Sequence, residues 1–96
     1  MAHPKTTQIL TAVTANSNGA AIQAAGPFST IFIGGTFDTC NVDAELSPDG
    51  ITWFPVRGAT PWTEAGCDNL DVSEGVWLRL VVSSVGGSTS INAWIN

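Results

Sequence analysis

The sequence predicts an all-β fold: a single antiparallel β-sandwich, jelly-roll or immunoglobulin-like, with about eight or nine short strands. Three observations predict it. No segment repeats its apolar residues at helical spacing, and β-branched residues occupy most apolar positions. Short apolar segments also recur about every ten residues, separated by Gly, Pro, Asn and Ser, as in all-β sandwiches. A chain of 96 residues has room for one such domain.

The strands are expected between clusters of turn-forming residues, the first of which is Asn16-Ser17-Asn18-Gly19. Residues 1–5 are expected to form a flexible N-terminal arm, and residues 6–96 are expected to form the sandwich domain. The segment 20–24 is a weak strand, because Ile22 is its only sizeable apolar residue. The expected strands are 6–14, 20–24, 28–37, 41–46, 51–56, 69–73, 75–83 and 89–95, with a loop over 58–66.

Alternation along each segment indicates which side chains are buried. The segment 28–37 carries apolar residues on both faces, which is typical of a central strand, and its Gly34-Gly35 pair predicts a bulge or a sharp bend. The other strong segments carry one clear apolar stripe each. These stripes are Val42, Ala44 and Leu46; Val76, Leu78, Leu80 and Val82; and Ile91, Ala93 and Ile95.

A tight hairpin turn is predicted at Ser47-Pro48-Asp49-Gly50. Pro48 presets φ, Gly50 can adopt positive φ, and Ser47 and Asp49 can bond the local backbone. Two strand registers fit this turn. A three-residue loop places Ala44 opposite Phe54 and Trp53 on the acidic face, whereas a four-residue loop places Ala44 opposite Trp53 and the indole in the core. The larger apolar gain favours Trp53 inside.

The composition excludes several functions. Only 11% of residues are charged, and three cations (Lys5, Arg57, Arg79) against eight carboxylates give a net charge of −5. A nucleic-acid site or an anionic membrane would need a basic cluster, which the sequence lacks. No apolar run is long enough to span a bilayer, and the N-terminus lacks the apolar centre of a signal peptide, so we expect synthesis and assembly in a cytoplasm.

Catalytic and metal-binding patterns are also missing. His3 is the only histidine and lies in the predicted arm, so no Ser-His-Asp or Cys-His arrangement is expected. The carboxylates are scattered, and Asp68, Asn69 and Asp71 do not have EF-hand spacing, although oxygen-rich loops can bind calcium. Cys40 and Cys67 are expected to be reduced thiols, with a disulfide as the alternative. We therefore expect no enzyme, no cofactor and no metal.

So low a fraction of charged residues means either that uncharged polar groups cover the surface or that a partner covers part of it. Trp62, in a proline-flanked loop, is the tryptophan least expected to be buried by its own domain. Together with Trp77 and Trp94 it could form a sugar-stacking platform or a protein interface, unless these rings belong to the core. The residues proposed for an interface are Met1, His3, Lys5, Phe54, Trp62 and Trp94.

Taken whole, residues 28–96 resemble the small β-sandwich structural proteins of tailed bacteriophages. The resemblance rests on the turn LSPDGITW, the late strand GVWLRLVVS and the closing segment STSINAWIN. It implies a non-enzymatic virion protein assembled in the host cytoplasm. The implied role is capsid decoration (cement), as a trimer that bridges capsomers of the major capsid protein. A head–tail connector, a tail or fibre component, and a carbohydrate-binding module remain alternatives.

Overall fold

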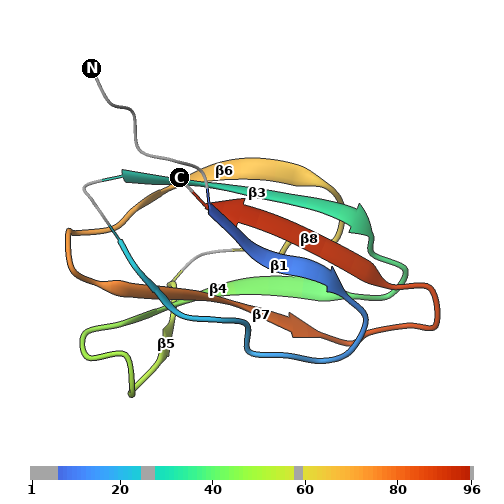
Figure 1. The fold of residues 1–96 in the computed structure, drawn as a ribbon, viewed down its shortest axis with the longest axis horizontal. Coiled ribbons are helices and arrows are strands. Elements are labelled where there is room, and N and C mark those ends of the chain that lie inside the picture. Colours follow the sequence, from blue (N-terminus) through green and yellow to red (C-terminus); the bar gives the residue numbers. More distant parts are fainter. Residues whose placement is uncertain (1–6, 25–27, 58–59, 96) are drawn as a thin grey trace.

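The computed structural model describes residues 7–24, 28–57 and 60–95, so the predicted N-terminal arm lies outside the described residues. Over these residues the chain is all-β, with eight strands in two four-stranded antiparallel sheets packed as a sandwich (Figure 1). The strands are β1 (Thr7–Val13), β2 (Ile22–Gln23), β3 (Phe28–Thr36), β4 (Asn41–Ser47), β5 (Phe54–Pro55), β6 (Gly66–Asp71), β7 (Trp77–Ser83) and β8 (Ser90–Ile95). The predicted fold class is confirmed. In this part of the chain no helix is long and apolar enough to cross a membrane.

The connectivity is that of a jelly roll. Sheet A has the order β1-β8-β3-β6 and sheet B the order β2-β7-β4-β5. The first strand therefore pairs with the eighth, the second with the seventh, the third with the sixth and the fourth with the fifth. One long hairpin, rolled up around its β4–β5 turn, produces this pairing. An immunoglobulin-like sandwich would place the first two strands in one sheet, so the structure decides between the two predicted arrangements.

The core lies between the sheets and is made of the predicted stripes. Its buried residues include Leu10 of β1, Ile31 and Ile33 of β3, Val42 and Ala44 of β4, Leu78, Leu80 and Val82 of β7, and Ile91, Ala93 and Ile95 of β8. Each set comes from alternate positions of a strand, as period-two patterning requires. β3 lies between β8 and β6, which confirms the prediction of a central strand.

The glycine pair of β3 does not form the predicted bulge. β3 pairs with β8 without a register shift from Ile31↔Ile95 to Thr36↔Ser90, across both glycines. Gly35 is required for another reason: its φ is +108°, and a β-carbon there would overlap the carbonyl oxygen of Ser90. The glycine marks a close approach of two backbones.

The β4–β5 hairpin corrects both predicted registers. Leu46 lies opposite Phe54 and Glu45 opposite Pro55, so the connection is longer than a three- or four-residue loop. The predicted burial of Trp53 in the core is also wrong. Its half-buried ring lies under the guanidinium of Arg79, 4.4 Å from ring centroid to Cζ, beside Glu45 on the outer face of sheet B. The longer loop places Trp53 outside the core, and the cation–π contact with Arg79 stabilises the ring there.

Candidate interaction surfaces

Side chains, as much as backbone, hold the β4–β5 turn together. The Ser47 hydroxyl accepts hydrogen bonds from the backbone N–H of Gly50 (2.8 Å) and of Asp49 (3.3 Å). Asp49 Oδ1 accepts from the N–H groups of Ile51 (2.8 Å) and Thr52 (2.9 Å) and from the Ser47 hydroxyl (3.0 Å). Gly50 has φ +77°. The predicted turn chemistry of Ser47, Asp49 and Gly50 is therefore confirmed.

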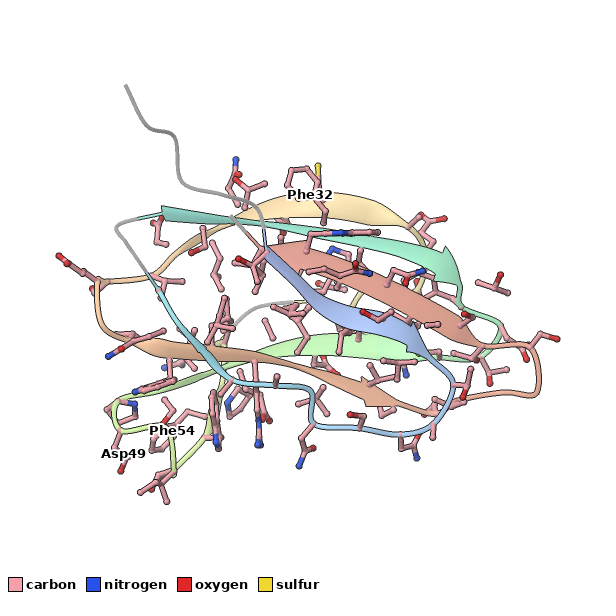
Figure 2. All side chains as sticks on the ribbon, viewed as in Figure 1. Phe32, Asp49 and Phe54 are labelled. Atoms are coloured by element: carbon pink, nitrogen blue, oxygen red, sulfur yellow. The ribbon has the colours of Figure 1, made fainter. Side chains whose placement is uncertain are left out.

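This rigid turn exposes two apolar side chains, Ile51 and Phe54, which we call the apolar tip. Ile51 is 81% exposed and Phe54 54% exposed. Figure 2 shows Phe54 on the lower side of the sandwich, close to Asp49. Removing such apolar side chains from water lowers the free energy of the complex. A turn that is already ordered loses little conformational entropy on binding. Phe54, proposed from the sequence as an interface residue, is placed where a partner can reach it.

The turn should weaken in acid. Hydrogen bonds from the N–H groups of Thr52 and Ile51, and from the Ser47 hydroxyl, hold the pKa of Asp49 below its ordinary value of 3.8. Because the pKa of Asp49 is lower in the folded state than in the unfolded state, the ionised carboxylate stabilises the fold at pH values above the unfolded-state pKa. This stabilisation is lost as the pH falls through the folded-state pKa. We expect Asp49→Asn to lower the urea midpoint at neutral pH, with the gap to the unmodified protein closing below about pH 4.

The control for this experiment is Asp71→Asn. Asp71 is exposed at the end of β6 and, among the described residues, makes no side-chain hydrogen bond. Its substitution should leave the urea midpoint almost unchanged at both pH values. A gap at Asp49 that stays constant with pH would contradict a role for the ionised carboxylate.

The outer face of sheet B is occupied by its own contacts. Arg79 donates to Glu45 through Nε (2.8 Å), and its Nη2 lies 2.7 Å from the same oxygen. Its other side stacks on Trp53. The ring of Trp77 lies against Gly50, where an added β-carbon would be 3.3 Å from the indole. On this face Arg79 thus contacts both Glu45 and Trp53.

The outer face of sheet A is different, and we call it the aromatic face. Phe32 and Trp94 lie directly opposite each other on β3 and β8, with Gln8 and Cys67 beyond them on β1 and β6. Phe32 is 39% exposed and points away from the sandwich in Figure 2. Most of the side chains that alternation places here are uncharged, among them Gln8, Thr30, Phe32, Cys67, Asn69, Asn92 and Trp94, and Asp71 adds a carboxylate at the end of β6.

A cavity of about 260 Å³ lies between the sheets on the side where β5 and β6 are the edge strands. Trp62 forms part of its wall and exchanges two backbone hydrogen bonds with Val42 (2.9 and 3.0 Å). Trp62 is half-buried, as are the other three tryptophans, and it packs against the core, so it does not stand out as the tryptophan least covered by its own domain. The other lining residues are Ile31, Ala44, Val56, Thr60, Asp68, Asn69 and Leu70.

The structure separates the remaining predicted site residues. Trp94 lies half-buried on the outer face of sheet A, Trp77 on the outer face of sheet B and Trp62 against the core, so the three do not form one platform. Met1, His3 and Lys5 lie outside the described residues.

Both cysteines are free thiols, so the structure does not contain the disulfide that the sequence left open. Cys40 is buried and Cys67 is exposed on β6. Burial raises the pKa of the Cys40 thiol above its ordinary value of 9.0. Within the described ranges no group of three or more His, Cys, Asp or Glu side chains is placed to hold a metal ion.

Sequence reasoning missed Ile51 and Phe32. Ile51 was assigned to the strand 51–56, where neighbouring strands would partly bury it. It lies instead in the longer turn that precedes β5. Phe32 had a usable signal: it shares a face of β3 with Thr30, opposite the buried Ile31 and Ile33. An aromatic residue on the polar face of a central strand is a candidate for external contact.

Comparison of the chain with protein-family models, with curated proteins and with solved structures finds no match in any of the three.

Proposed function

We propose that this chain is a non-enzymatic structural protein of a tailed-bacteriophage virion. Its proposed role is capsid decoration: it binds the outside of the shell and bridges neighbouring capsomers. The observation that carries the proposal is the apolar tip, an exposed Ile51 and Phe54 on a turn held by five side-chain hydrogen bonds. The sequence resemblance to small phage β-sandwich proteins supplies the class of assembly.

The energetics of the tip suit such a role. Covering an exposed isoleucine or phenylalanine contributes roughly 1.5–3 kcal/mol each. Because many copies act on one shell, contacts of this size add up to a useful stabilisation without a large interface on each chain.

The charge distribution is compatible with the outer surface of a shell. The chain has a net charge of −5 and three cations, so it has little attraction for the packaged DNA. The proposed partners are the major capsid protein and further copies of the same chain, as a trimer. The runner-up role is a head–tail connector, tail or fibre component, which would use the same tip on a different partner.

Copy number in purified virions of the encoding phage tests the proposal. Quantitative mass spectrometry should find hundreds of copies, whereas about six or twelve would indicate a connector or tail ring of cyclic symmetry and overturn the decoration role. Binding of the purified protein to undecorated shells should fall at least about tenfold in the double variant Ile51→Ser/Phe54→Ser, roughly 1.4 kcal/mol. Phe32→Ser is the matched control, since it removes a phenylalanine from the opposite side.

A further inference from the structure

We infer that the aromatic face of sheet A is a binding site for a neutral glycan. The inference concerns surface that the proposed shell contact does not use. It rests on four features of this face: two adjacent aromatic rings, two fixed carboxamides, an open position at Gly34 and the lack of a cation among its described residues.

The rings lie at the centre of the face. Phe32 and Trp94 are directly opposite in the β3–β8 register, so their side chains are neighbours on one surface. β3 and β8 are the two inner strands of sheet A, which gives both rings a rigid support. The C–H groups of a pyranose ring pack on an aromatic surface in the way other apolar groups do. Two neighbouring rings offer a platform for one or two sugar units.

Two asparagines flank the rings with their carboxamides held in place. Asn92 Oδ1 accepts from the N–H of Ala12 (2.9 Å) and from Gln8 Nε2 (3.4 Å). Asn69 Oδ1 accepts from the Thr30 hydroxyl (2.8 Å). Among the described residues neither Nδ2 group has a hydrogen-bond partner, so each presents two donors. Sugar hydroxyl oxygens are suitable acceptors, and a preordered donor binds at a low entropic cost.

The space for a ligand lies above Gly34. Gly34 pairs with Asn92 and precedes Gly35 in β3, two residues from Phe32. A β-carbon at Gly34 would meet nothing within 4 Å. The absence of a side chain at this position leaves a shallow depression beside a ring and a carboxamide. A hydroxyl or a substituent of the sugar fits there.

The charge and the area of the aromatic face indicate which class of ligand it can bind. Among the described residues of this face no cation is present to bind a phosphate, sulfate or carboxylate, and both Asp71 and the net charge of −5 oppose any anion. The four strands of sheet A have six to nine residues, and they span roughly 19 by 20–30 Å, an area of roughly 400–600 Å². A stable protein interface buries about 800 Å² on each partner, so the face is small for a second copy. It is ample for a short, uncharged oligosaccharide.

The test is a titration of the full chain with cello-, malto-, chito- and galacto-oligosaccharides, followed by calorimetry and by amide chemical shifts. We expect at least one to bind, with shift changes confined to the aromatic face, and sialyllactose to bind less tightly. Phe32→Ser and Gly34→Leu should each weaken binding at least tenfold. Gly34→Leu fills the depression without straining the backbone, and the unfolding midpoint of each variant establishes that it folds.

Phe54→Ser is the matched control, because it removes an exposed phenylalanine elsewhere and should leave glycan binding unchanged. Absence of binding by every neutral sugar overturns the inference, and so does binding that survives both face variants. Concentration-dependent shift changes without sugar would assign the face to a second copy instead. Shell binding lost in Phe32→Ser would assign it to the shell. Loss of shell binding in the tip variant with intact glycan binding separates the two proposals.

Discussion

Gly35→Ala is expected to destabilise the fold by about 2–5 kcal/mol. Two costs combine. Alanine resists the φ of +108°, and its β-carbon would overlap the carbonyl oxygen of Ser90 on β8. The obstacle is backbone in the centre of sheet A, so it cannot move aside as a side chain can. A domain of this size is stable by about 5–15 kcal/mol, so the loss is a substantial share.

The neighbouring glycine provides the control. At Gly34 an added β-carbon meets nothing within 4 Å, and Gly34→Ala should change the unfolding free energy by about 1 kcal/mol or less. Thermal unfolding measures both, since 1 kcal/mol corresponds to roughly 4–8 °C for a domain of this length. Equal melting temperatures for the two variants would show that β3 and β8 are not as closely spaced as the structure describes.

Leu80→Ala is expected to cost about 2–5 kcal/mol, because it leaves a cavity in the middle of the core. Leu80 is fully buried on β7, pairs with Ala44 of β4 and faces sheet A. β7 and β4 are the inner strands of sheet B, so neither can shift far to fill the space. Urea unfolding should show a lower midpoint with an unchanged slope.

Val81→Ala is the matched control for that core substitution. Val81 is the next residue of β7, points to the outer face opposite Asp43 and is half-buried. Its truncation should cost about 1 kcal/mol or less. A larger loss at Val81 than at Leu80 would mean that the inward and outward faces of β7 are reversed, a one-residue register error.

The fold class and most strands could be predicted because they depend on local pattern. Val42 and Ala44, and likewise Leu78 and Leu80, are buried where alternation places them. The turn chemistry of Ser47 and Asp49 was equally predictable, since these side chains bond backbone groups only a few residues away. Strand ends were less so: β6 begins at Gly66, inside the predicted loop.

The candidate surfaces depended on longer-range contacts. Phe54 was proposed as an interface residue and is exposed. Trp62 was expected to be the tryptophan least covered by its own domain, but it pairs with Val42 and packs against the core. Trp53 was expected inside and lies outside, because Arg79, from a strand distant in sequence, offers its ring a partner. The free energy gained by burying an aromatic ring depends on which residues surround it in the folded protein. Amino-acid composition does not contain that information.

The amino-acid sequence by itself determined a two-faced, all-β domain with no basic cluster and with a turn near its middle whose side chains bond their own backbone. Those properties follow from residue-by-residue alternation and from turn residues that act on their own backbone. Only the tertiary structure decided the jelly-roll order, the grouping of Phe32 with Trp94 and the exposure of Ile51. These depend on which strands pair across long stretches of chain, and the pairing energy is shared among many residues, none of which specifies it alone.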